Sequence, residues 1–127
     1  MEPSATPAVL VVDDNEDVRD LAVEILSDAG YETTGAGNAV EAIRYLTQRD
    51  FDLIFTDIAM PGLSGFALAR QARQLQPGLR VVFTTGFIAP EGWDEARYGR
   101  VLRKPYSPRQ LAAEIARALE GTAPEGR

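Results

Sequence analysis

Short apolar runs alternate with amphipathic stretches along almost the whole chain. The apolar runs occupy residues 9–12, 53–56, 81–84 and 101–102, and each is followed or preceded by a segment with helical spacing. This alternation is typical of repeated βαβ units, which build a parallel sheet with helices on its faces. Five such units fit into the chain, with residues 31–34 as a short polar strand suited to a sheet edge.

Helical spacing is clearest directly after the first apolar run. Apolar residues recur there at i, i+3, i+4, i+7 and i+8, the positions that share one face of a helix. They are Val18, Leu21, Ala22, Ile25 and Leu26. We expect this stripe to face the sheet. Residues 90–98 lack such a stripe and contain a proline and a glycine, so a fourth helix there is expected to be short or mobile.

Polar residues predict where three further helices begin. Asn38 with Glu41 three residues later has the form of a reciprocal cap, and so does Ser107 with Gln110. Ser64 is the expected cap of the third helix.

Each of the four apolar strands leads into a polar residue that phosphoryl chemistry uses. Asp13 and Asp14 follow the first strand, Asp57 and Thr85 end two others, and Lys104 comes after the last. In an open parallel sheet, ligands bind beyond the carboxyl ends of the strands, so residues distant in sequence converge there. Three carboxylates, a hydroxyl and an ammonium are therefore expected in one pocket.

Crowded carboxylates repel one another unless a cation lies among them. Mg²⁺ is the expected occupant, with Mn²⁺ as a possible substitute, because it takes oxygen ligands and is normally held by carboxylates and phosphate oxygens. Asp57 stands alone after a fully apolar strand and is the best candidate nucleophile, which would give an aspartyl phosphate. Asp13 and Asp14 would hold the metal, while Thr85 and Lys104 would contact phosphoryl oxygens.

Length and composition indicate one domain. The chain has 127 residues, 45% of them hydrophobic, which suits a single core at residues 8–120 with flexible tails at residues 1–7 and 121–127. Cysteine is absent, which excludes disulfides and thiolate metal sites. The apolar runs are too short to cross a bilayer and no signal peptide is evident, so a cytoplasmic protein that does not bind membranes is expected.

Net charge and the content of histidine and lysine limit the classes of function further. A net charge of −6 argues against a broad nucleic-acid surface, and the absence of histidine means that any phosphohistidine donor is another protein. Of the 13 basic residues 12 are arginine, and the single lysine is Lys104. A compact ammonium kept at one strand end indicates a requirement of the site, since an arginine fork has a different geometry.

Five motifs, in this order and spacing, resemble the receiver domain of bacterial two-component response regulators. They are Val11-Val12-Asp13-Asp14, Thr56-Asp57, Met60-Pro61-Gly62 with Gly65, Thr84-Thr85-Gly86 and Lys104-Pro105-Tyr106. The resemblance covers residues 8–119. It implies an α/β, doubly wound (βα)5 flavodoxin-like fold with a five-stranded parallel sheet in the order 2-1-3-4-5.

The resemblance also implies residue roles. Asp57 would be the phosphoacceptor, Asp14 a direct Mg²⁺ ligand, Asp13 a ligand acting largely through water, and the backbone carbonyl of Ala59 the remaining protein ligand. The phosphoryl group would come from a histidine kinase or a histidine phosphotransfer protein. A downstream protein target would recognise the phosphorylated form, and the domain would catalyse only its own phosphoryl transfer and dephosphorylation.

Thr85 would be the switch hydroxyl and Lys104 the lysine that pairs with phosphate, preceding a cis proline bond. The family usually carries an aromatic residue three positions before this lysine, where the chain has Val101. Phe87 and Tyr98 are the candidates for a substitute ring.

Other classes remain as alternatives. A small Mg²⁺-dependent phosphatase also forms an aspartyl phosphate. Such enzymes carry an Asp-x-Asp pattern after the first strand, whereas this chain has Asp13-Asp14-Asn15 there and its candidate nucleophile after a later strand. A flavin or nucleotide carrier would need a glycine-rich phosphate loop after that strand. A degenerate receiver that only binds a partner would lack some site residues. The chain is either a stand-alone regulator or a piece of a hybrid kinase or larger regulator.

Overall fold

The computed structural model describes residues 6–86 and 99–120. Five strands and four helices lie within these ranges. In chain order they are β1 (Ala8–Val12), α1 (Glu16–Asp28), β2 (Glu32–Ala36), α2 (Ala39–Gln48), β3 (Leu53–Asp57), α3 (Gly65–Leu75), β4 (Arg80–Thr85), β5 (Arg100–Arg103) and α5 (Pro108–Glu120). The predicted fourth helix falls on residues outside these ranges, as do Phe87 and Tyr98.

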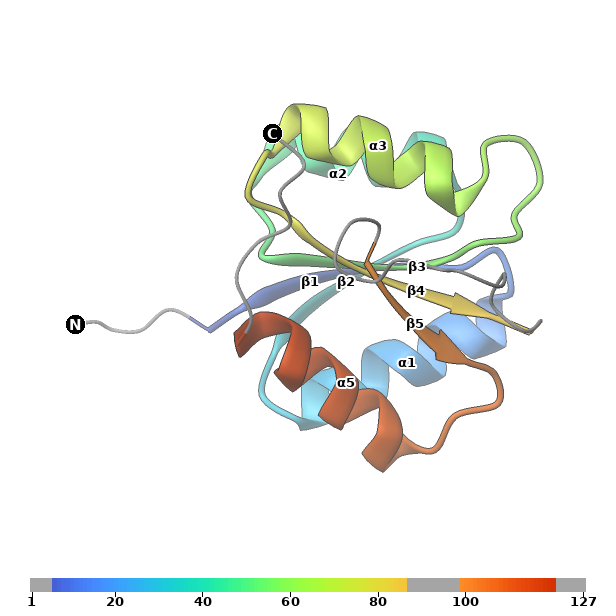
Figure 1. The fold of residues 1–127 in the computed structure, drawn as a ribbon, viewed down its shortest axis with the longest axis vertical. Helices are drawn as coiled ribbons and strands as arrows, with labels where there is room; N and C mark the ends of the chain where they lie inside the picture. Colours follow the sequence, from blue (N-terminus) through green and yellow to red (C-terminus); the bar gives the residue numbers. More distant parts are fainter. Residues whose placement is uncertain (1–5, 87–98, 121–127) are drawn as a thin grey trace.

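All five strands pair in parallel in the order β2-β1-β3-β4-β5. Helices α2 and α3 cover one face of the sheet, and α1 and α5 cover the other (Figure 1). Apolar side chains fill the space on both sides, so β1, β3 and most of β4 are buried. The doubly wound, flavodoxin-like fold and its strand order are therefore confirmed, and β3 lies at the centre of the sheet.

The predicted helix caps are present. Asn38, Ser64 and Ser107 each accept the backbone N–H of the residue three positions later. Gln110 returns the bond by accepting the backbone N–H of Ser107 at 2.8 Å, which completes a reciprocal cap. On α2 the second bond of the cap differs from the prediction, because Glu41 accepts the backbone N–H of Gly37 at 2.7 Å and not that of Asn38. That bond fixes the β2–α2 turn.

The apolar stripe of α1 is narrower than its spacing predicts. Ala22 and Leu26 are buried against the sheet, but Leu21 is 53% exposed, so its predicted inward position is wrong. Consecutive residues lie about 100° apart around a helix, which places Leu21 at the edge of the stripe when Ala22 marks its centre. None of the helices in residues 6–86 and 99–120 is long and apolar enough to cross a membrane.

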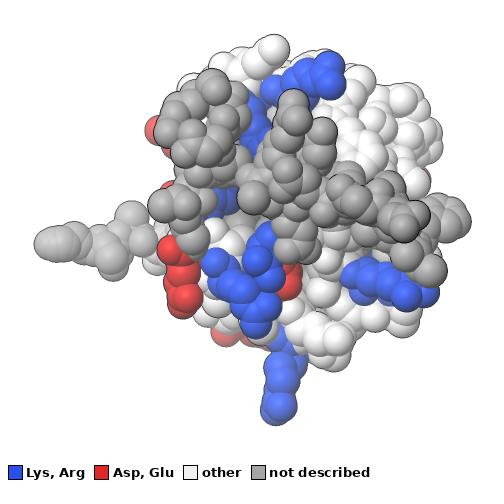
Figure 2. Space-filling view, in the orientation of Figure 1, with Lys and Arg blue, Asp and Glu red and all other residues white. Residues whose placement is uncertain are grey.

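Charge is distributed unevenly over the surface. Helix α1 carries five acidic residues and one arginine, whereas β5 and α5 together carry four arginines and two glutamates. On the face seen in Figure 2, basic side chains stand over β5 and α5 as separate groups with uncharged and acidic atoms between them.

Candidate functional site

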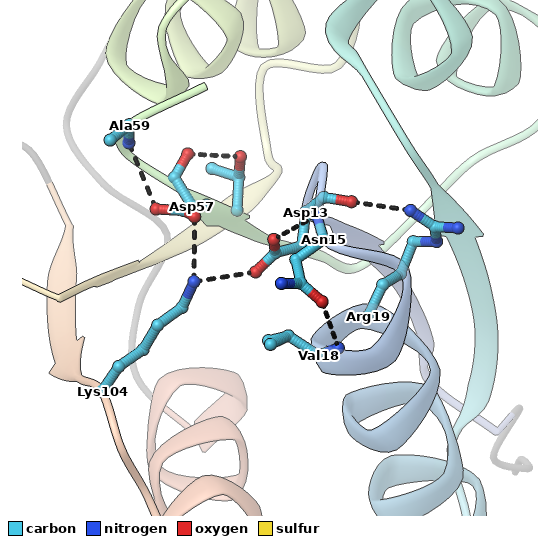
Figure 3. A network of polar contacts seen from close by, with 8 residues as sticks. Asp13, Asn15, Val18, Arg19, Asp57, Ala59 and Lys104 are labelled. Atoms are coloured by element: carbon cyan, nitrogen blue, oxygen red, sulfur yellow. Dashed lines mark hydrogen bonds and ion pairs between the residues drawn. The ribbon is translucent and has the colours of Figure 1, made fainter. Parts of the chain in front are cut away.

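Three strand ends bring the predicted site residues to one edge of the sheet. Asp13 directly follows β1, Asp57 ends β3, and Lys104 directly follows β5. Figure 3 shows the lysine side chain pointing from its strand end toward both carboxylates. Asp13 is 3% exposed and Asp57 is 6% exposed, so the two acids are almost removed from bulk water.

Asp57 is held by two contacts on opposite sides of its carboxylate. Its Oδ1 accepts the backbone N–H of Ala59 at 3.1 Å, and its Oδ2 accepts a hydrogen bond from Lys104 Nζ at 2.9 Å. A carboxylate oxygen has room for more than one donor, so both oxygens keep capacity for another ligand. The arrangement fixes the direction of the carboxylate and leaves acceptor capacity on both oxygens.

Lys104 bridges the two buried acids. Its Nζ also donates to Asp13 Oδ2 at 3.0 Å, and its side chain is 23% exposed. Burial, the largest single influence, lowers the pKa of Lys104, but hydrogen bonds and charge from Asp57 and Asp13 together outweigh it. The pKa of Lys104 therefore lies above its ordinary value, and the ammonium form is favoured in the site.

Asp13, Asp14 and Asp57 form an acidic cluster. Each offers one carboxylate oxygen, and these three atoms all lie within 4.8 Å of one another. Three formal negative charges face one ammonium, which leaves two uncompensated. Opposite ligands of an octahedral Mg²⁺ lie about 4.2 Å apart. The donor atoms, their spacing and the residual charge all fit a small divalent cation.

Thr85 lies at the end of β4, next to the site. Its side chain is buried, and its backbone carbonyl accepts the N–H of Lys104 at 2.8 Å. The carbonyl of Thr84 accepts the N–H of Ile58 at 2.9 Å. The end of β4 thus anchors both the loop after Asp57 and the segment that carries Lys104. The peptide bond between Lys104 and Pro105 is cis, as the resemblance implied.

Two residues on or beside α1 support Asp13 and were not among the predicted site residues. Asn15 caps α1 and donates its backbone N–H to Asp13 Oδ1 at 2.9 Å. Arg19 Nη1 donates to the backbone carbonyl of Asp13 at 2.8 Å. Asn15 could have been found, because asparagine before two acidic residues is a common helix start. Nothing in the sequence signals the contact of Arg19.

Ala59 was predicted to contribute its carbonyl to the metal. The contact in the structure is its N–H, which orients Asp57, and the role of the carbonyl stays a prediction. Val101 lies in β5 opposite Phe83 and is half-buried against the core on the α2–α3 side of the sheet.

Gly65 follows the turn after Asp57 and also allows α3 to pack closely against the end of β3. A Cβ atom at this position would lie 2.2 Å from the backbone oxygen of Asp57 and 2.9 Å from the Cα of Ile58. The first residue of α3 therefore packs directly against the backbone of the acidic strand end. Only glycine permits this approach, because any side chain would push α3 and Asp57 apart.

Lys104→Met should destabilise the metal-free protein and make it more responsive to Mg²⁺. Loss of the ammonium leaves three carboxylates without a counter-charge, which we expect to cost about 2 kcal/mol, between the values for exposed and buried pairs. Mg²⁺ should then raise the melting temperature more than in the wild type, since no ammonium competes for the acids. Thermal melts with and without Mg²⁺ measure both effects.

Arg103→Met is the matched control, because it removes one positive charge from the exposed preceding residue. Its melting temperature and Mg²⁺ response should stay near those of the wild type. Equal responses to Mg²⁺ in Lys104→Met and the wild type would show that Lys104 does not compensate the acidic cluster.

Comparisons with known proteins identify the domain. A family model described as the response regulator receiver domain matches residues 9–116. The response regulator receiver protein CpdR of Brucella abortus is 38% identical over 115 residues, which span 87% of this chain and 95% of that protein. The sensor kinase CckA of the same species is 31% identical over 123 residues, which span 92% of this chain but 13% of that protein. Similar domains thus occur alone and within much longer proteins.

Solved structures agree with this assignment. The chemotaxis protein CheY4 of Vibrio cholerae superposes with a TM-score of 0.83 at 29% identity, covering 90% of this chain and 99% of that one. The response regulator TrrA of Thermotoga maritima, solved in complex with Mg²⁺ and BeF, gives a TM-score of 0.79 at 26% identity, covering 89% and 99%. The match over most of the chain, together with the acidic cluster and its lysine, places the chain in the receiver domain family of response regulators, which are regulatory phosphoacceptors of phosphorelays rather than conventional enzymes.

Proposed function

We propose that Asp57 is the residue that accepts the phosphoryl group. The observation that carries this proposal is the position of its carboxylate, which ends the central strand, contacts Lys104 and has an oxygen within 4.8 Å of oxygens of both Asp13 and Asp14. Asp57 is buried and its carboxylate is directed by the Ala59 N–H, so one oxygen can be presented to phosphorus in a fixed direction.

Transfer would form one bond and break one. An oxygen of Asp57 attacks phosphorus in line with the leaving group, the new O–P bond forms, and the bond from phosphorus to the donor breaks. With a phosphohistidine donor, the P–N bond breaks and the imidazole nitrogen keeps the electron pair. A histidine kinase or histidine phosphotransfer protein is the upstream partner that a receiver domain implies.

Mg²⁺ is proposed as the ion of the acidic cluster, with Asp13, Asp14, Asp57 and the Ala59 carbonyl as its protein ligands. When bound, it would neutralise charge on the phosphoryl oxygens during transfer. The three carboxylates fit such an ion because their oxygens all lie within 4.8 Å of one another, and the Ala59 carbonyl would add a further oxygen ligand. Mn²⁺ would fit the same oxygen ligands.

After transfer, Lys104 and Thr85 would respond to the new group. The ammonium of Lys104 would exchange an Asp57 oxygen for a phosphoryl oxygen, and the Thr85 hydroxyl would donate to another. Because the backbones of these two residues are hydrogen-bonded, a shift of one is passed to the other. We propose that a downstream protein, in the cytoplasm, recognises this change. Val101 cannot serve as the aromatic switch, since it carries no ring.

Phosphorylation with acetyl phosphate tests the metal assignment. The wild type should gain one phosphoryl group in Mg²⁺, seen by intact-protein mass spectrometry, and none after chelation. Asp14→Ala should gain none at millimolar Mg²⁺, although its metal-free form should melt higher because one crowded carboxylate is gone. Asp17→Ala, which removes an exposed acid from the first turn of α1, is the control and should behave like the wild type. Labelling that ignores Mg²⁺ or Asp14 would refute the assignment.

A further inference from the structure

Arg19 reaches the acidic site from the side opposite to Lys104. It projects from the first turns of α1, and its Nη1 donates to the carbonyl oxygen of Asp13 at 2.8 Å (Figure 3). The contact is with the backbone and not with a carboxylate. Arg19 is half-buried, which is uncommon for arginine unless its guanidinium has a partner. Its contact therefore bears on how the backbone of the site is held.

The backbone around Asp13 is fixed at several points. Its N–H donates to the carbonyl of Ala36 at 3.2 Å, and its carboxylate accepts from Asn15 and Lys104. The carboxylate of Asp14 differs, because no hydrogen bond within residues 6–86 and 99–120 holds it. Its direction is therefore set by its own backbone and by any bound cation.

The hydrogen bond from Arg19 acts on that backbone. The peptide unit that joins Asp13 to Asp14 is planar, so fixing its carbonyl oxygen also fixes the nitrogen of Asp14. This plane in turn limits the directions in which the Asp14 side chain can leave the main chain. One bond to the Asp13 carbonyl thus restrains both the buried and the exposed acid of the pair.

Glycines in and after β2 make room for the arginine. A Cβ atom at Gly37 would lie 3.2 Å from Arg19 Nη1, and one at Gly35 would lie 3.4 Å from its Cδ. The N–H of Gly37 is itself held by the Glu41 carboxylate at 2.7 Å, so this turn cannot readily move away. The guanidinium therefore lies in a fitted space between α1 and the end of β2.

We infer that Arg19 is a positioning residue for cation binding, which holds the Asp13–Asp14 peptide in the orientation that directs Asp14 toward the ion. This inference rests on the metal site proposed above. A positioning role and a purely electrostatic role of Arg19 predict opposite changes in Mg²⁺ affinity when the arginine is removed. Removing a positive charge near three carboxylates would strengthen Mg²⁺ binding if Arg19 acted only through its field, whereas loss of positioning weakens it.

Calorimetric titration with Mg²⁺ alone separates these cases. Arg19→Met should weaken Mg²⁺ binding about tenfold, the lower end of the losses seen when a residue that orients metal ligands is removed. Arg44→Met removes the same charge from an exposed site on α2 and should leave the affinity unchanged or slightly higher. Gly37→Ala keeps Arg19 but crowds its Nη1, and should cause a smaller loss in the same direction.

Wild type and Asp14→Ala measured in the same series keep the two proposals apart. If the wild type binds no Mg²⁺, or Asp14→Ala binds it equally well, the proposed metal site is wrong. If those two behave as expected but Arg19→Met binds Mg²⁺ as tightly as the wild type or more tightly, the role of Arg19 is wrong. A lower melting temperature with unchanged affinity would also overturn it, and Gly37→Ala decides the matter should Arg19→Met not fold.

Discussion

Asp57→Asn is expected to gain no phosphoryl group from acetyl phosphate and Mg²⁺ under conditions in which the wild type gains one. The substitution keeps the size and shape of the side chain but replaces the nucleophilic carboxylate with an amide, which has one acceptor oxygen in place of two. Asp57 ends the central strand, and both Lys104 and the Ala59 N–H direct its carboxylate, so its loss should remove the acceptor. Intact-protein mass spectrometry measures the result.

Asp50→Asn provides the control for this experiment. It makes the same chemical change at an exposed position shortly before β3 and should leave labelling at the wild-type level. Circular dichroism of both variants would show that each is folded. A full phosphoryl group on folded Asp57→Asn would exclude Asp57 as the acceptor.

Gly65→Ala is expected to lower the free energy of unfolding by about 3 kcal/mol, the upper end of the usual range for overpacking. The cost is high because the added methyl group would meet the backbone of Asp57 and Ile58, and not the end of a flexible side chain. Relief requires α3 or the end of β3 to move. Phosphorylation should therefore also slow, since the Asp57 carboxylate moves with its backbone. Denaturant unfolding and labelling rates measure the two effects.

Gly78→Ala is the matched control, because a Cβ atom there has no heavy atom within 4 Å and the residue does not have positive φ. It should be neutral or stabilise the protein by about 0.5 kcal/mol. A folded Gly65→Ala protein with the stability and labelling rate of Gly78→Ala would show that this close approach is not required.

Much of the fold follows from the spacing of apolar residues and from local capping chemistry. Parallel strands buried on both faces read as continuous apolar runs, which is why β1, β3 and β4 are evident in the sequence. Ser107 and Gln110 predict the start of α5 because both partners of the cap lie within four residues. The strand order needed the family resemblance, since spacing alone does not say which strands are neighbours.

Some residues of the site could likewise be predicted from the sequence, and others could not. Asp13, Asp57 and Lys104 could be predicted because strand ends in a parallel sheet share one edge. Arg19 could not, because its partner is a backbone carbonyl, which every residue has. Gly65 was visible as a turn residue, but its contact with Asp57 depends on the angle at which α3 approaches β3. Leu21 fits a helical stripe and is still exposed, because the pattern does not give the width of the contact.

The most direct measurement locates the phosphoryl group in the wild-type chain. Sodium borohydride reduces an acyl phosphate on aspartate to homoserine, and peptide mapping by mass spectrometry then identifies the modified position. The protein labelled with acetyl phosphate and Mg²⁺ should carry homoserine at position 57, and the sample labelled without divalent cation should carry none. Homoserine at position 13 or 14, or at 57 to the same extent without the cation, would contradict a metal-dependent acceptor at the end of the central strand.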